Sequence, residues 1–175
     1  MSPLRPLLVG GDRRSQARST AALARVIDTP GLVDDLVALT GDDDWLVSMR
    51  ALDLVEKLAH THREWIEPHK RLFIGPLADS DKWEIRLQVV RALPLFAWTA
   101  SERRRVVAIL TRDVDFPQTF VKAWALDSLA TFSDADPRLR AVVRRQLQRF
   151  ERSGSKALAA RARRIAARID GRRSG

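Results

Sequence analysis

Three stretches of this chain repeat one another at intervals of about 37 residues. They begin at Trp45, Trp83 and Thr119, and each places apolar residues at the same relative positions. The equivalent positions are Val47, Ile85 and Val121, then Ala51, Val89 and Ala125, and finally Leu58, Phe96 and Phe132. Repetition at this period is typical of stacked helix pairs, in which each pair buries its apolar face against its neighbours. We therefore expect a stack of helices that binds through an extended surface.

Each repeat opens with an apolar stripe of helical periodicity. From Val47 and from Ile85, the residues at i+4, i+7, i+8 and i+11 are apolar, which places them on one face of a helix. Residues that favour helix starts precede both stripes: Asp42–Asp44 in one copy, and Asp81 with Glu84, as in a capping box, in the next. Further start signals open the second helix of each pair at Thr61–Glu64, Thr99–Glu102 and Asp136–Pro137.

Prolines are expected to disturb two of these helices. Pro94 lies inside the helix that starts at Trp83 and should kink it, because proline removes a backbone donor. Pro68 and Gly75–Pro76 should make the second helix of the preceding pair irregular.

The repeated pattern Asp-x-x-x-Val-Arg-x-x-Ala-x-x-x-Leu resembles HEAT repeats and the related armadillo-like units, with the best matches at Asp81–Phe96 and Asp43–Leu58. Arg86 and Lys122 match the basic position of the motif, whereas Ser48 departs from it. The resemblance implies an all-α fold, a right-handed α-α superhelix of about four helix pairs plus a C-terminal helix. It also implies that first helices lie on the convex side and second helices on the concave side.

We predict a single helical-repeat domain over residues 1–175. Its parts are an N-terminal arm (1–11), an atypical capping repeat (12–41), three repeats (42–79, 80–114 and 115–153), a C-terminal capping helix (154–170) and a tail (171–175). The terminal units fit the period poorly, as expected where the ends of a stack must be covered.

Composition argues against several classes of protein. The chain has no cysteine, which excludes disulfides and zinc–thiolate sites. No apolar run approaches the roughly 20 residues of a membrane helix, and the run Leu7–Val9 is too short for the core of a signal peptide. We therefore expect a cytoplasmic protein without a membrane partner.

Candidate metal and phosphate sites have simpler interpretations. His60, His62 and His69 lack the spacing of metal ligands, and Asp42–Asp44 lacks the spaced oxygens and closing Glu of a calcium loop. The segment Gly10–Ser15 lacks the strand, Lys and spacing of a nucleotide loop. We therefore predict no metal, no cofactor and no small-molecule substrate, and we interpret the aspartates as helix caps.

The sequence lacks the residue patterns of two enzyme classes that are built from HEAT-like repeats. The His-Glu dipeptides of the iron-binding hydroxylases are absent. The DNA alkylation-repair glycosylases combine Trp with Asp and Arg, but Trp124 and Asp127 are three residues apart rather than the four that this resemblance implies. We predict no catalytic residues, with glycosylase activity as a minor alternative. Trp45 and Trp83 share one repeat position and are interpreted as packing residues.

The chain has a net charge of +9, and the charge of each helix depends on whether it is the first or the second of its repeat. The first helices (42–60, 80–98 and 115–132) sum to −3, whereas the second helices (62–78, 101–113 and 136–152) sum to +7. The acidic segment 30–40 breaks this trend. The candidate polyanion-binding residues form two helical stripes, Arg138, Arg145, Arg149 and Arg152, and Arg161, Arg164 and Arg168. Solvated surface stripes, or a genome biased towards arginine, are the alternative explanations.

Together these patterns predict a non-enzymatic binding module or scaffold that recognises a protein partner through its concave surface. The alternative is binding of the DNA or RNA backbone by a basic inner face and the C-terminal arginine stripes.

Overall fold

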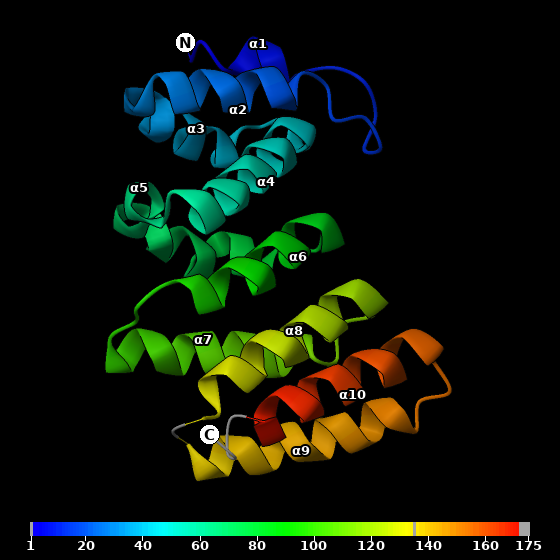
Figure 1. Cartoon of the computed structure of the whole chain (residues 1–175). Helices are drawn as coiled ribbons and strands as arrows, with labels where there is room; N and C mark the ends of the chain where they lie inside the picture. The colour runs from blue at the N-terminus through cyan, green and yellow to red at the C-terminus, as the bar shows by residue number, and fades with distance from the viewer. Residues whose placement is uncertain (1, 135, 172–175) are drawn as a thin grey trace. The chain divides into compact units, whose positions relative to one another are not determined.

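The computed structural model describes residues 2–134 and 136–171 (Figure 1). All regular secondary structure in these residues is helical, which confirms the predicted all-α class. The chain divides into two compact units, Met1–Phe96 (unit 1) and Ala97–Gly175 (unit 2), and each is described by itself. No helix among the described residues is both long and apolar enough to cross a membrane. Residues 172–175 of the predicted tail lie outside the described residues, and the assignment of one domain stays a prediction.

Unit 1 alternates α-helices with 3-10 segments. Its elements in chain order are α1 (Arg5–Leu8), α2 (Ser19–Asp28), η1 (Pro30–Leu32), α3 (Val33–Ala38), η2 (Leu39–Gly41), α4 (Trp45–Thr61), α5 (Arg63–Ile66), η3 (Glu67–Ile74), η4 (Pro76–Asp79), α6 (Trp83–Ala92) and η5 (Leu93–Leu95). The first helices α4 and α6 of consecutive repeats pack directly against each other, and α5 and η3 pack behind them.

Unit 2 is built from four longer helices, α7 (Ala100–Asp113), α8 (Thr119–Phe132), α9 (Pro137–Glu151) and α10 (Lys156–Gly171). Helix α8 contacts α7, α9 and α10, and α9 packs along α10. The first helices α8 and α10 therefore form one layer of this unit, and the second helices α7 and α9 form the other (Figure 1).

The repeated apolar positions form the core of both units. Eight of the nine equivalent residues are buried, and only Phe132 is half-buried. The Arg103 guanidinium lies over the Phe132 ring, 5.6 Å from its centroid. The predicted apolar stripes are thus the faces on which the helices pack.

One of the expected helix irregularities takes a different form. Pro94 ends α6 instead of kinking it: the helix stops at Ala92 and continues as the 3-10 segment η5. Proline lacks the N–H that the next α-helical bond needs, and its ring crowds the preceding turn. Pro68 has the expected effect, because α5 is only four residues long and passes into η3.

Three of the predicted caps are present. Asp44 accepts a hydrogen bond from the Leu46 amide at the start of α4, and Asp136 accepts from two amides at the start of α9. Thr99 and Glu102 form a reciprocal capping box on α7. These side chains satisfy amides that a helix start leaves without intrahelical partners.

Two predicted capping boxes are absent because the helix boundaries lie elsewhere. Helix α4 runs on to Thr61, so Thr61 is its last residue and cannot cap the following helix. Helix α6 begins at Trp83 with Lys82 as its N-cap, which puts Glu84 at the second helical position. Glu84 is therefore not placed to reach back to the N-cap amide.

A buried arginine holds the segment that precedes α2. Arg50 of α4 is only 1% exposed. Its Nη1 donates to the carbonyl of Leu8 at 2.6 Å, its Nη2 to Asp12 at 2.9 Å and its Nε to Ser15 at 3.0 Å. All three acceptors are backbone carbonyls, so one guanidinium fixes the whole turn between α1 and α2.

Replacing Arg50 with Ala should lower the free energy of unfolding by about 3 kcal/mol, because three carbonyls lose a charged donor at once. Urea unfolding measures the change. Arg25→Ala is the matched control: Arg25 is exposed, its side chain has no partner among the described residues, and its loss should change stability by less than about 0.5 kcal/mol. Equal effects of the two substitutions would contradict the role of Arg50.

An ion pair joins α1 to the start of α4. Arg5 Nε lies 2.8 Å from Asp42 Oδ2, and Arg5 Nη2 lies 3.0 Å from Oδ1. Asp42 Oδ1 also accepts from the Asp44 amide at 2.9 Å. The hydrogen bond from Arg5 is the main cause that lowers the pKa of Asp42 below its ordinary value.

Titration of the Asp42 carboxyl, followed by carbon-detected NMR, should give a pKa below that of an unperturbed aspartate. Because the folded-state pKa is lowered, the pair stabilises the fold above the unfolded pKa, and this contribution is lost as the pH falls through the folded pKa. Arg5→Ala should move the pKa of Asp42 upward. An unchanged pKa in that variant would show that Arg5 is not the cause.

Candidate binding surfaces

The four arginines of the predicted α9 stripe lie on one exposed face of that helix. Residues Arg138, Arg145, Arg149 and Arg152 are all exposed, and the opposite face buries Leu139, Val143, Leu147 and Phe150. We call these four residues the α9 arginine face. A helix that places its apolar residues on one side necessarily presents the others together.

Three members of the α9 arginine face have no local counter-charge. The side chains of Arg138, Arg145 and Arg152 make no hydrogen bond or ion pair with any residue that the structure describes. Arg149 is different: its Nη2 pairs with the Asp115 carboxylate and lies 3.4 Å from the Val114 carbonyl. The structure thus divides this stripe into three solvated cations and one that holds the α7–α8 loop.

The three arginines of the α10 stripe also fall into two groups, two that form ion pairs and one that does not. Arg161 Nη1 lies 2.7 Å from Asp127 Oδ2, and Arg168 Nη1 lies 2.6 Å from Oδ1 of the same carboxylate. Arg164 is exposed and has no side-chain partner among the described residues. Two of the three predicted polyanion ligands are therefore already bound to a carboxylate of α8.

Asp127 acts as an anchor for α10. The carboxylate is 13% exposed, and each of its oxygens faces a guanidinium. Arg168 also donates to the Asp127 backbone carbonyl at 3.1 Å, and the Arg161 guanidinium lies 4.4 Å from the centroid of the Trp124 ring. Trp124 and Asp127 are thus part of the contact between α8 and α10, and both oxygens of the carboxylate bond to guanidinium groups.

The excess positive charge belongs to unit 2. Residues 2–96 contain 13 Lys and Arg against 14 Asp and Glu, whereas the described residues from 97 to 171 contain 16 against 8. Helices α7 and α9 together carry nine arginines and three acidic residues. Two of those acids, Glu102 and Asp113, are buried. The charged residues that α7 and α9 expose are therefore almost all cationic.

The histidines lie apart and have non-metal partners. His60 Nε2 lies 2.7 Å from Glu56 Oε1, His69 Nε2 lies 3.0 Å from Asp34 Oδ1, and the His62 ring stacks on Trp65 with centroids 4.1 Å apart. Within the described residues, no three His, Cys, Asp or Glu side chains converge in a way that could hold a metal ion.

In the glycine-containing segment before α2, two backbone amides bond to a carboxylate of the same segment. The backbone N–H groups of Arg14 and Ser15 both donate to Asp12 Oδ1, at 2.9 and 3.0 Å. Gly10 and Gly11 adopt positive φ angles of 89° and 71°, which allow the chain to turn here. Amides already bonded to a local carboxylate are not available to cradle a phosphate.

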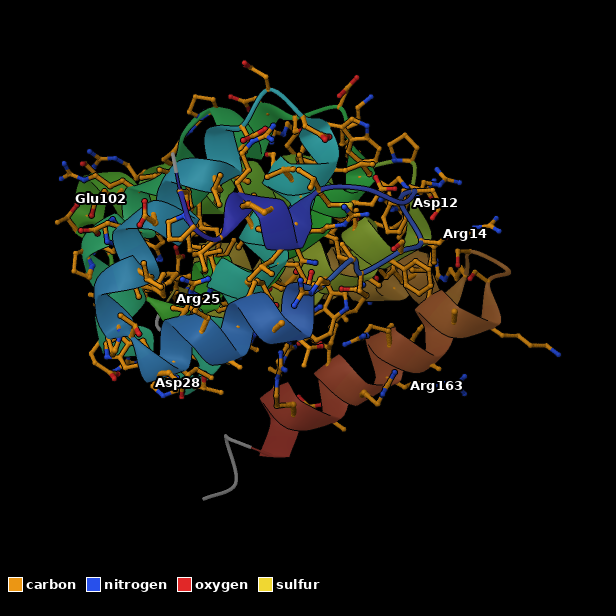
Figure 2. The ribbon with its side chains drawn as sticks, turned by 90° about the horizontal axis from the view of Figure 1, so that it is seen from above. Asp12, Arg14, Arg25, Asp28, Glu102 and Arg163 are labelled. Carbon is orange, nitrogen blue, oxygen red and sulfur yellow. The ribbon has the colours of Figure 1, made fainter. Side chains whose placement is uncertain are left out.

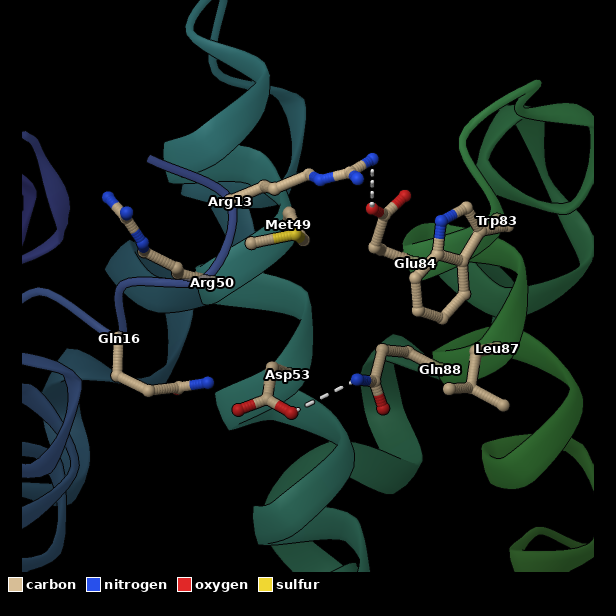
Figure 3. Close-up of a pocket in the computed structure, with 9 residues that line it drawn as sticks. All are labelled: Arg13, Gln16, Met49, Arg50, Asp53, Trp83, Glu84, Leu87 and Gln88. Carbon is tan, nitrogen blue, oxygen red and sulfur yellow. Dashed lines mark hydrogen bonds and ion pairs between the residues drawn. The ribbon is translucent and has the colours of Figure 1, made fainter. Parts of the chain in front are cut away.

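A cavity of about 140 Å³ lies in unit 1, between α4, α6 and the segment before α2 (Figure 3). Its lining combines charged, amide and apolar side chains: Arg13, Gln16, Met49, Arg50, Asp53, Trp83, Glu84, Leu87 and Gln88. No pattern in the sequence predicted this cavity, although its lining includes Trp83 from the repeated tryptophan position.

Comparison with known proteins supports the fold. No protein-family model matches the chain, and no curated protein matches it either. Among solved structures, an engineered protein superposes with a TM-score of 0.65 at 19% identity, covering 96% of this chain and 80% of that one. A designed armadillo repeat protein in complex with the peptide (KR)4 gives a TM-score of 0.63 at 15% identity, with coverage of 96% and 80%.

A computationally designed armadillo repeat protein for modular peptide recognition gives a TM-score of 0.63 at 16% identity, with coverage of 96% and 81%. Identities this low are evidence for the fold alone. The chain has the armadillo/HEAT-like fold, an all-α superhelical repeat, as its sequence pattern predicted.

Replacing Asp127 with Asn should loosen α10 from α8, because two partly buried arginines lose their shared counter-charge. We expect a loss of about 2 kcal/mol in the free energy of unfolding and faster amide hydrogen exchange confined first to α10. Glu151→Gln on α9 is the control, since Glu151 is exposed and has no partner among the described residues. If α10 exchanges no faster in Asp127→Asn than in the control, the anchor is not at Asp127.

Proposed function

We propose that this protein is a non-enzymatic binding module that holds a protein partner. Its armadillo/HEAT-like fold supports this proposal, since stacked helix pairs offer long surfaces and the designed relatives described above recognise peptides. The pairing of both Asp127 oxygens with arginines also argues against the glycosylase alternative, because Trp124 and Asp127 are the pair that was compared with that family.

The surface that best suits this role is the α7–α9 layer of unit 2. Its second helices correspond to those that line the concave side in HEAT-like proteins, and its exposed charges are nearly all positive. The α9 arginine face contributes three guanidinium groups without a local partner. The partner segment proposed here is therefore acidic, because opposite charge accelerates association and favours the correct partner.

Binding of a nucleic-acid backbone is the second candidate. The observation in its favour is that Arg138, Arg145, Arg152 and Arg164 all have solvated side chains. Guanidinium groups of this kind bind phosphates as readily as carboxylates. The two candidates differ in what is bound, so competition between the ligands distinguishes them.

Reversal of Arg138, Arg145 and Arg152 to Glu should abolish binding of an acidic partner without unfolding unit 2, because none of these side chains holds the fold together. The probes are a fluorescent polyglutamate peptide and, separately, random single-stranded and duplex DNA at two salt concentrations. Tighter binding of the peptide supports the protein partner. Tighter binding of DNA, with a steep salt dependence, supports the second candidate.

The matched control reverses Arg14, Arg18 and Arg25 in unit 1, which changes the net charge by the same amount. Arg14 lies in the segment before α2, and Arg25 lies on α2 (Figure 2). All three are exposed and have no side-chain partner among the described residues. If both triple variants weaken binding equally, or if neither probe binds at low salt, the α9 arginine face is not the site.

A further inference from the structure

A second hollow in unit 1, of about 370 Å³, lies between η1–α3 on one side and α5–η3 on the other. A space of this size is within the usual range of ligand pockets. The residues that give it its chemical character are two carboxylates, an indole, an imidazole and two prolines: Asp34, Glu64, Trp65, His69, Pro30 and Pro68. We call this hollow the Trp65 pocket. Among the described residues that line it there is no lysine or arginine.

Both carboxylates of the Trp65 pocket are open to solvent. The Asp34 side chain is 85% exposed, and its partner among the described residues is His69, whose Nε2 lies 3.0 Å from Asp34 Oδ1. Glu64 is exposed, and its side chain makes no hydrogen bond or ion pair with any described residue. Because neither carboxylate is held by a buried partner, each is available to an incoming cation.

The indole of Trp65 is held in place by a residue outside the pocket. Its ring stacks on that of His62, with centroids 4.1 Å apart, and His62 does not line the pocket. The indole N–H has no hydrogen-bond partner among the described residues, and it is not one of the buried polar atoms that water cannot reach. The indole, together with Pro30 and Pro68, therefore offers a ligand an apolar surface and one available donor.

The chain on the α3 side of the pocket is acidic. Residues 26–49 contain six aspartates and no lysine, arginine or histidine. This run includes the acidic segment 30–40, which departs from the basic trend of the other second helices. A surface of this charge attracts cations and repels polyanions. An acidic partner, which suits the α9 arginine face, therefore does not suit the Trp65 pocket.

We infer that the Trp65 pocket binds a lysine or arginine side chain presented by a protein partner. Such a side chain packs its methylene groups against the indole and the prolines and keeps its charged end in water, close to the carboxylates. A metal ion suits the pocket less well, since no three His, Cys, Asp or Glu side chains converge among the described residues. The pocket shares no residue with the α9 arginine face. The inference therefore goes beyond the proposed function and can hold or fail independently of it.

The test titrates the full chain with tetralysine and, separately, with tetra-arginine, and it follows the indole N–H signals in two-dimensional NMR. The Trp65 signal should shift saturably, with a dissociation constant on the order of 1 mM for so short a peptide. The signals of Trp45 and Trp83, which do not line this pocket, are internal references. Tetralysine acetylated at each side-chain amine keeps the methylene groups but loses the charge, and it should not bind.

Glu64→Gln and Asp34→Asn should each weaken tetralysine binding about threefold, and the double variant should weaken it about tenfold. Each substitution removes one charge and keeps the shape of the side chain. Both residues are exposed, so the fold should be retained, and thermal unfolding of each variant checks this.

Glu151→Gln on α9 is the matched control, because it makes the same change of charge at an exposed residue that does not line the pocket. It should leave the dissociation constant unchanged. The inference is overturned if the Trp65 signal does not shift, if acetylated tetralysine binds as tightly as tetralysine, or if Glu151→Gln and Glu64→Gln have equal effects. It is also overturned if the chain self-associates without peptide and Glu64→Gln abolishes that association, because the occupant is then a second copy of this chain.

Discussion

Burial of the nine repeated apolar residues, here called the seam, is the interaction on which both units depend. Val47, Ile85 and Val121 occupy the same place in successive repeats and are almost completely removed from water. Burial of an aliphatic side chain contributes about 1.5–3 kcal/mol, and the seam supplies several in each helix pair. In α9 and α10 the buried residues occupy only one face, so the opposite face is not constrained by packing. The residues on that opposite face can therefore be selected for binding.

Arginine has three distinct roles once the seam has set which face is buried. Arg50 is buried and bonds only to backbone carbonyls, so it shapes the segment before α2. Arg161 and Arg168 share the Asp127 carboxylate and hold α10 against α8. Arg145, by contrast, has no partner among the described residues. The role of each arginine depends on whether a neighbouring element brings backbone carbonyls, a carboxylate or no partner close to its guanidinium group.

The sequence pattern was sufficient for the repeats and for most helices, because periodicity reports which residues share a face. The pattern failed to predict which caps and side-chain partners form, because these depend on where a helix begins and on which residues a neighbouring element brings close. Thr99–Glu102 and Asp81–Glu84 look alike in the sequence, yet only the first is a capping box, because α6 begins one residue too late for Glu84 to cap it. Likewise, spacing placed Arg164 and Arg168 on one stripe. It could not show that Asp127, from a helix earlier in the chain, would bind one and not the other.

The distribution of charge argues against compositional bias as the whole explanation for the arginine content. A genome that favours arginine adds it to every exposed surface in proportion, but residues 2–96 have one more acidic than basic residue. The described part of unit 2 has twice as many basic as acidic residues, although the same bias acts on both units. A surplus confined to one unit, and exposed on helices whose other face is packed, is the pattern expected if the acidic partner proposed above binds there. The net charge of +9 averages over this difference between the two units.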